Sequence, residues 1–185
     1  MINVCVFCGS TPGANAAFME SAEELGGLLA EAGFGLVYGG GAAGLMGAVS
    51  ASALRAGGTV IGVIPQALVD RELARTDLQQ LHVVSNMHER KALMYELSDA
   101  FVILPGGLGT FDEFFETATW NKLGLHAKPS MVVDVDGYYA PMRAMLQGAL
   151  ENGFFTHGDQ DLISFHDAPA GVIAALAMLA DHEAG

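Results

Sequence analysis

The stretch Leu104-Pro105-Gly106-Gly107-Leu108-Gly109-Thr110-Phe111-Asp112-Glu113 places three glycines within four residues. An apolar run at 100–104 leads into it and predicts a short buried strand, and a helical pattern at 111–123 leads out of it. Glycine lets the backbone approach a ligand closely and adopt positive φ. A strand, a glycine turn and a helix N-terminus together favour an anion site, because free N–H groups and the helix dipole point at one spot.

Acidic side chains crowd the start of the helix that follows the glycines. Asp112, Glu113 and Glu116 all lie in its first two turns. Glu113 stands three residues after Thr110, so one interpretation is a capping box with Thr110 as the N-cap. Carboxylates facing a bound phosphate would repel it. If the glycines hold a phosphate, at least one acid is expected to face another part of the ligand, such as sugar hydroxyls or a developing cation.

Short apolar strands alternate with helical patterns along the chain. Strands are expected at 4–7, 34–38, 60–64, 81–84, 100–104, 131–135 and 162–165, and helices at 16–32, 45–56, 87–97, 111–123, 139–152 and at the end of the chain. This alternation predicts an α/β fold with a doubly wound parallel sheet and helices on both faces. No repeat or linker is visible, so residues 1–185 are expected to form a single nucleotide-binding domain. The glycine turns follow strands and should gather at the carboxyl edge of the sheet, where such folds bind ligands.

The composition is acidic and rich in apolar residues. Apolar residues make up 51% of the chain, and its formal net charge is −13. Nucleic acids and anionic membranes require a basic face, so neither is an expected partner. A strand-like run begins at once, so no secretory signal peptide is expected, and no apolar stretch reaches the roughly 20 residues of a membrane span. The predicted location is cytoplasmic.

Cysteine and histidine usage predicts neither a disulfide nor a metal site. Cys5 and Cys8 are three residues apart on or beside a strand, so they should point to opposite faces, about 10 Å apart, too far for a disulfide. We interpret them as buried thiols, with a redox role as the lesser alternative. The six histidines form no ligand-like cluster, and His157 and Asp159 are expected in a loop. No metal or cofactor is predicted.

A second glycine turn, Gly39-x-Gly41-x-x-Gly44, matches the dinucleotide fingerprint by spelling. That fingerprint also needs an acid near the end of the next strand, to hold a ribose. Here that strand ends in Pro65-Gln66, so NAD binding is not expected. The turn could still hold one phosphate or a ribose. Tight helix–strand packing is the structural alternative, and it explains the last glycine better than the first two.

Adjacent cations begin the helix expected at 87–97. Arg90 and Lys91 stand out in a chain with only three lysines, although charge pairs usually form a solvated face. They follow a strand on the presumed ligand edge, and the arginine fork suits phosphate or carboxylate. Arg71, Glu72 and Arg75 lie in a polar segment that could cover the same edge, with a surface role as the simpler interpretation.

The segment 105–113 resembles the PGGxGTxxE motif of the Lonely Guy family, which are cytokinin riboside 5′-monophosphate phosphoribohydrolases formerly mislabelled as lysine decarboxylases. The resemblance extends from residue 4 to about residue 155, and the combined set of motifs is highly specific. The other similar pieces are, in chain order, Cys8-Gly9-Ser10, Tyr38-Gly39-Gly40-Gly41, Gly44-Leu45-Met46-Gly47, 60–65, 87–91, Thr119-Trp120 and Asp136-Gly137-Tyr138-Tyr139. The resemblance implies a Rossmann-like homodimer that hydrolyses a nucleoside 5′-monophosphate to free base and ribose 5-phosphate. A partner subunit would also suit the aromatic residues of helix 111–123, which cover more than one face; burial in the core is the alternative.

The resemblance also implies the roles of particular residues. Arg90 and Glu113 would be the catalytic pair. The implied substrate-binding positions are Ser10, Gly40, Gly41, Glu72, Met87, Arg90, Lys91, Gly106, Gly107, Leu108, Gly109, Thr110, Phe111, Asp112 and Thr119. Cleavage of an N-glycosidic bond builds positive charge on the sugar, and a carboxylate such as Glu113 could stabilise it and activate water. Arg90 could neutralise the phosphate or fix the geometry of Glu113.

Two other functions remain compatible with the sequence. The first is a general purine nucleotide nucleosidase that acts on AMP itself. The second is a non-enzymatic nucleotide or molybdenum-cofactor carrier, because such carriers resemble this fold and have related glycine motifs. Amino-acid decarboxylation would require a lysine that carries pyridoxal phosphate, and Lys91, Lys122 and Lys128 show no such context.

Overall fold

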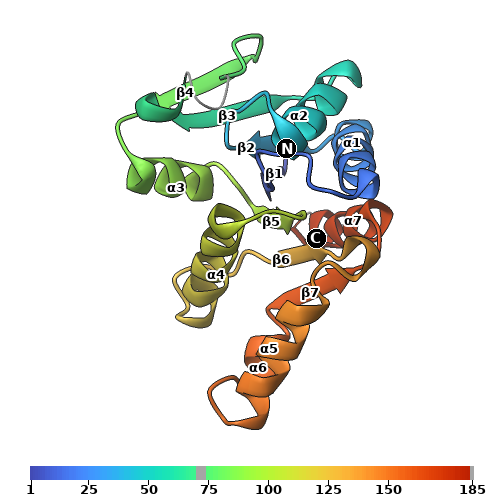
Figure 1. The fold of residues 1–185 in the computed structure, drawn as a ribbon, viewed down its shortest axis with the longest axis vertical. Coiled ribbons are helices and arrows are strands. Elements are labelled where there is room, and N and C mark those ends of the chain that lie inside the picture. Colours follow the sequence, from blue (N-terminus) through green and yellow to red (C-terminus); the bar gives the residue numbers. More distant parts are fainter. Residues whose placement is uncertain (70–73, 184–185) are drawn as a thin grey trace.

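In the part of the chain that the structure describes, seven parallel strands form one sheet (Figure 1). The structure is a computed structural model, and it describes residues 1–69 and 74–183, with side chains up to residue 180. In their order across the sheet, the strands are β4 (Gln80–Val84), β3 (Val60–Pro65), β2 (Gly35–Tyr38), β1 (Asn3–Phe7), β5 (Ala100–Ile103), β6 (Ser130–Val133) and β7 (Ile163–His166). The predicted doubly wound parallel sheet is confirmed.

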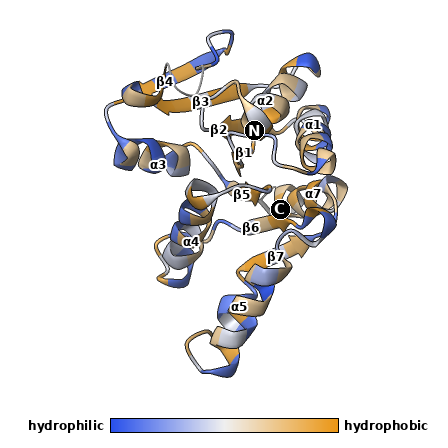
Figure 2. Cartoon of the chain, in the orientation of Figure 1, coloured by the Kyte–Doolittle hydropathy of each residue, from blue (hydrophilic) through white to orange (hydrophobic). Residues whose placement is uncertain are grey.

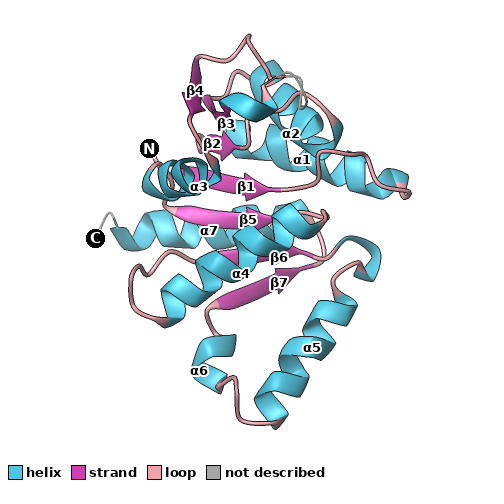
Figure 3. Ribbon diagram, turned by 60° about the vertical axis from the view of Figure 1, so that its left-hand side comes forward, coloured by secondary structure: helices cyan, strands magenta, loops and turns pink. Residues whose placement is uncertain are grey.

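Helices cover both faces of the sheet (Figure 3). One face packs against α1 (Ala16–Glu31), α2 (Gly44–Arg55) and α7 (Pro169–Glu183), and the other against α3 (Met87–Glu96), α4 (Leu108–Lys122) and α5 (Ala140–Glu151). Short helices connect some elements: η1 (Gln66–Leu68), η2 (Val135–Gly137) and α6 (His157–Gln160). Figure 2 shows hydrophobic strands in the middle and hydrophilic residues on helices and turns, as a sheet covered on both faces requires.

Alternation along the strands divides the interior into two hydrophobic cores. On β1, Val4 and Val6 point into the core beneath α1, α2 and α7, whereas Cys5 and Phe7 point into the core beneath α3, α4 and α5. Cys8 follows β1 and joins the first core, so the two thiols lie on opposite faces of the sheet, and both are free. This confirms the prediction that they form no disulfide with each other.

Two local predictions were wrong. The helix after the glycine motif begins at Leu108 rather than at residue 111, because Gly107 adopts extended φ/ψ angles of −104° and −150° and serves as the N-cap. Thr110 is therefore inside the helix, and the capping-box interpretation of Glu113 fails. His157 and Asp159 lie in the short helix α6 instead of a loop, because Thr156 and Asp159 form a reciprocal capping box there.

The switch in strand order occurs at β1, which pairs with β2 on one side and β5 on the other. The turns that follow β1 and β5 consequently meet at the carboxyl edge of the sheet. The Gly9 amide donates to the Pro105 carbonyl at 3.0 Å and ties the two turns together. A parallel sheet places its ligand crevice at such a point.

Candidate active site

A cavity of about 270 Å³ opens at the carboxyl ends of β1 and β5. Its walls come from the turn after β1, the start of α2, one side of α3 and the first turns of α4. Of the residues predicted from the sequence, those that line it are Ser10, Met87, Arg90, Gly107, Leu108, Gly109, Thr110, Asp112 and Glu113. The fold thus brings both members of the expected catalytic pair to one cavity.

The N-terminus of α4 forms one wall of this cavity. Gly107 is its N-cap, and no side chain caps the first N–H groups of the helix. A Cβ atom added at Gly107 or Gly109 would meet no heavy atom within 4 Å, so the backbone here is open to the cavity. A 15-residue helix with an uncapped, exposed N-terminus is well suited to an anion such as a phosphate.

The turn before α4 is held from below by two tyrosines. The Tyr138 hydroxyl donates to the Gly106 carbonyl at 2.5 Å, and the Tyr139 hydroxyl donates to the Leu104 carbonyl at 2.7 Å. Gly106 itself is packed: an added Cβ would lie 2.1 Å from the Thr110 Oγ1 atom. Gly106 therefore shapes the turn, while its neighbours Gly107 and Gly109 face the open space.

Arg90 is a buried cation, with 6% of its surface exposed. Its Nε donates to the Val63 carbonyl at 3.1 Å, and its Nη2 donates to the Gly39 carbonyl at 2.8 Å. Lysine could not reproduce these contacts, because they use the planar, forked donors of a guanidinium. The ends of β3 and β2 thus hold the charge of Arg90 at the wall of the cavity.

Glu113 lies on α4 at the same cavity and is 9% exposed. Burial and the charge of Glu113 raise the pKa of the Cys8 thiol, whereas Arg90 lowers it, so both charges act at this end of the cavity. The net shift is upward, which keeps Cys8 protonated and makes it a poor nucleophile at neutral pH. The chemistry of the cavity is therefore that of a carboxylate and a guanidinium.

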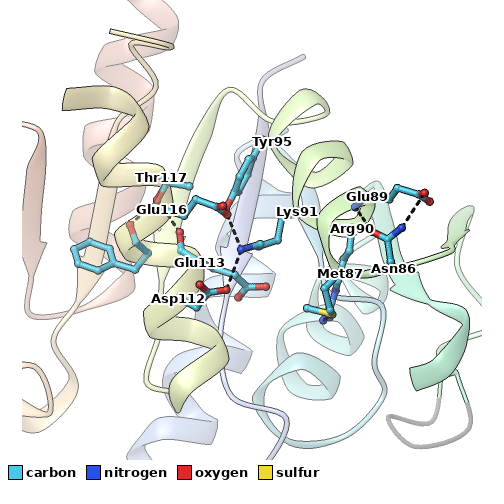
Figure 4. Close-up of polar contacts among 11 residues, drawn as sticks. Asn86, Met87, Glu89, Arg90, Lys91, Tyr95, Asp112, Glu113, Glu116 and Thr117 are labelled. Atoms are coloured by element: carbon cyan, nitrogen blue, oxygen red, sulfur yellow. Dashed lines mark hydrogen bonds and ion pairs between the residues drawn. The ribbon is translucent and has the colours of Figure 1, made fainter. Parts of the chain in front are cut away.

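Lys91 lies beside Arg90 on α3, but its ammonium points to α4 (Figure 4). Its Nζ is 3.0 Å from Asp112 Oδ2 and 2.9 Å from Glu116 Oε2, and the Tyr95 hydroxyl also donates to Glu116. Burial lowers the pKa of Lys91, but the hydrogen bonds and charges of the two carboxylates outweigh it, so the pKa is raised. Two of the three crowded acids are therefore paired with a lysine, and one of them, Asp112, also lines the cavity.

The other predicted residues that the structure describes are absent from the lining of the cavity. The Gly40 carbonyl accepts from the Arg75 amide, Gly41 pairs with Ala74, and Phe111 packs edge-on against Tyr139. Thr119 is exposed on the second half of α4, beside a separate hollow that Phe155 also lines. Glu72 and Arg71 lie outside the described residues.

Several cavity residues were not predicted. Cys8, Thr11, Met46 and Met94 all line the cavity, as does Gly39 of the turn that was expected to be able to hold a phosphate or a ribose. Met94 carried a usable signal, because it stands four and seven residues after Arg90 and Met87 and so shares their helix face. Met46 belongs to the piece Gly44-Leu45-Met46-Gly47 of the family resemblance, but its only local signal was its position just after a glycine turn.

The described residues contain neither a metal-binding cluster nor a helix that could span a membrane. No group of three His, Cys, Asp or Glu side chains there is arranged to hold a metal ion. Within the same ranges, no helix has the length and apolar character needed to cross a membrane.

Comparison with known proteins identifies the family. A family model described as "Possible lysine decarboxylase" matches residues 46–176. The chain belongs to this family. Within the family's relatives, it is 45% identical to a cytokinin riboside 5′-monophosphate phosphoribohydrolase of Rhodococcoides fascians, over 94% of this chain and 88% of that protein. It is 43% identical to the enzyme of the same name, LOG3, of Arabidopsis thaliana, over 86% and 74% of the two chains. The predicted resemblance to Lonely Guy proteins is confirmed.

Solved structures share the fold. The Moco carrier protein of Chlamydomonas reinhardtii superposes with a TM-score of 0.72 at 25% identity, covering 98% of both chains. Despite the description of the family, none of the described cavity-lining residues is a lysine. The lysines are engaged elsewhere: Lys91 with Asp112 and Glu116, Lys122 with Asp159, and Lys128 with the Tyr95 carbonyl.

Proposed function

We propose that this protein hydrolyses the N-glycosidic bond of a nucleoside 5′-monophosphate, of the cytokinin type, and releases the free base and ribose 5-phosphate. One observation carries the proposal: Arg90 and Glu113, both largely buried, line a single cavity whose wall is the uncapped N-terminus of α4. The names of the relatives with 43–45% identity support the same reaction.

The geometry suggests a division of labour among the cavity residues. The N–H groups after Gly107 would hold the 5′-phosphate, with Ser10 on the facing turn. Glu113 lies two turns or less into α4, so a ribose attached to that phosphate would lie beside its carboxylate. Arg90, fixed by two backbone carbonyls, would balance the negative charge of phosphate and carboxylate.

In the proposed reaction, water attacks C1′ as the C1′–N bond breaks and its electron pair passes to the base. Glu113 takes a proton from the water, and the departing base nitrogen gains one. The carboxylate also stabilises the positive charge that develops on the ribose ring. Water supplies both the new oxygen at C1′ and the proton on the base, so no further reactant is required.

An apolar side of the cavity would receive the base. Met46, Met87 and Met94 line it, and methionine sulfur makes favourable contacts with aromatic rings. These flexible side chains would accept adenine with or without an N6 substituent. AMP is therefore the alternative substrate. The ratio of the rates of base release from AMP and from a cytokinin nucleotide shows which of the two the protein prefers.

A homodimer and a cytoplasmic location complete the proposal. Leu108, Leu123 and Leu125 are 87%, 65% and 68% exposed on α4 and the turn that follows it, which favours a second copy seated on this side. Thr119 would then reach substrate from the partner copy. The free thiols of Cys5 and Cys8 suit a reducing compartment.

The test is base release from AMP and from isopentenyladenosine monophosphate, followed by chromatography. Glu113→Gln is expected to lower kcat about 10²- to 10⁴-fold, the usual contribution of a positioned acid–base group. Glu151→Gln, which removes one exposed carboxylate on α5, is the matched control and should leave kcat unchanged. Wild-type protein that binds nucleotide without releasing base would contradict hydrolysis and favour a carrier.

A further inference from the structure

We propose that Lys91 is a positioning residue: together with Tyr95, Asp112 and Glu116 it forms a clasp between α3 and α4 that sets the distance from Arg90 to Glu113. The inference rests on the proposed function and deepens it. It assigns Lys91 a task other than direct contact with substrate.

The clasp follows from helix periodicity. Lys91 and Tyr95 stand four residues apart on α3, and Asp112 and Glu116 stand four apart on α4, so each pair shares one helix face. The Lys91 ammonium bridges both acids at 3.0 and 2.9 Å, and the Tyr95 hydroxyl donates to Glu116 (Figure 4). Trp120, a further four residues along α4, packs edge-on against the Tyr95 ring at 4.8 Å. Asp112, Glu116 and Trp120, which stand four residues apart on α4, therefore all contact the face of α3 that carries Lys91 and Tyr95.

The expected catalytic residues are the immediate neighbours of the clasp. Arg90 precedes Lys91, and Glu113 follows Asp112. Consecutive helix residues are rotated by about 100°, so a clasp between two facing sides turns these neighbours toward the cavity. Arg90 is independently fastened to the sheet through Val63 and Gly39. Phe114 packs α4 onto the sheet, and the clasp adds the contact with α3 that fixes Glu113 relative to Arg90.

The surroundings of Lys91 do not resemble a phosphate-binding lysine. Its side chain is 12% exposed, it is absent from the cavity wall, and two carboxylates already occupy two of its three N–H donors. A phosphate would have to compete with both acids, and Asp112 would repel it from nearby. Glu116 is itself held by Tyr95, whose backbone carbonyl accepts from Lys128 at 2.6 Å. These contacts hold the Lys91 ammonium between Asp112 and Glu116.

Charge reversal separates a clasp from a phosphate contact. Lys91→Glu places a third acid against two others, and kcat should fall about 100-fold, the loss expected from a displacement near 1 Å. The double variant Lys91→Glu with Glu116→Lys restores an opposite pair and should recover most of that loss. If Lys91 holds the phosphate directly, the double variant will stay as slow as the single one, and the proposal is overturned.

A milder substitution covers the case in which charge reversal lowers the folded population. Lys91→Met keeps the aliphatic stem, and we expect a lower kcat with KM within about twofold of wild type, because an interaction that acts only on transition-state geometry is lost. A raised KM with unchanged kcat would show uniform substrate binding by Lys91 and overturn the clasp. Binding of ribose 5-phosphate to the same variant should match wild type.

Trp120 reports on the clasp without any substrate, because it is the only tryptophan of the chain and contacts Tyr95. Its emission should change in Lys91→Glu and return toward wild type in the double variant; unchanged emission in both would overturn the proposal. If the wild-type protein releases no base, only the proposed function is rejected. The tryptophan emission of the variants then still tests the clasp. Base release that the double variant fails to recover rejects the clasp and leaves the hydrolase intact.

Discussion

The two glycine turns at the carboxyl edge of the sheet look alike in sequence but are filled differently. In the turn after β2, other parts of the protein occupy the space beside the glycines. A Cβ atom added at Gly39 would lie 2.2 Å from Arg90 Nη2, and one added at Gly44 would lie 2.3 Å from the Thr11 amide nitrogen. In the turn after β5, the space beside Gly107 and Gly109 is open. One turn packs the fold together, and the other leaves room for a ligand.

The helices that follow the turns differ in the same way. At the start of α2, the amides of Leu45 and Met46 donate to the Gly9 carbonyl at 3.1 and 3.3 Å. The start of α4 has no side-chain cap and faces the cavity. A helix N-terminus attracts anions only where its N–H groups have no other acceptor. We therefore expect an anion such as a phosphate at the start of α4 and a supporting role for the turn after β2.

The largest expected effect is on folding, from Gly44→Ala. Gly44 has φ of +57°, and its Cβ would lie 2.3–2.6 Å from the backbone of Ser10 and Thr11. Positive φ and overpacking should together cost roughly 2–5 kcal/mol in the free energy of unfolding, measured in urea. Gly57→Ala, at φ +77° in open space, is the control and should show only the conformational cost of about 1–2 kcal/mol. An equal loss of unfolding free energy in both variants would show that the close packing of Gly44 against Ser10 and Thr11 contributes nothing.

A smaller effect, confined to activity, is expected from Gly39→Ala. Its Cβ would displace the ends of the Arg90 and Met46 side chains, which can move, so the chain should still fold. We expect kcat for base release to fall about 100-fold as Arg90 shifts. Gly35→Ala, at the other end of β2, would press on the Asn3 Oδ1 atom at a similar 2.2 Å and should retain activity. Full activity of Gly39→Ala would show that the position of Arg90 is unimportant.

The smallest effect is expected from Gly107→Ala. Its extended backbone accepts alanine, so the free energy of unfolding should stay within about 0.5 kcal/mol of wild type. The methyl group would enter the cavity and raise KM about tenfold, roughly the 1.4 kcal/mol of a lost close contact. Gly148→Ala on α5, also in open space, should leave KM unchanged. An unaltered KM in Gly107→Ala would place the phosphate elsewhere.

The sequence predicted the layout of the site better than its contacts. Nine of the predicted residues line the cavity, because strand ends and glycine turns are local patterns whose place in a parallel sheet follows from topology. The start of α4 was placed three residues too late, since Thr110 and Glu113 imitate a capping box. Met94 was missed although it shares a helix face with Met87 and Arg90, and Met46 was missed because its position after a glycine turn does not distinguish a cavity methionine from a core methionine.

Local pattern alone was enough for the order of the strands and longer helices along the chain, the two glycine turns and the separation of Cys5 from Cys8, because each depends on a few neighbouring residues. Only the tertiary structure showed which turn is open and which acids face Lys91. A glycine in the sequence indicates that another group can approach closely, but it does not show which group does so. That group can be distant in sequence: Arg90 contacts Gly39 across 51 residues. The same holds for α3 and α4, whose facing sides are matched only after both have packed on the sheet.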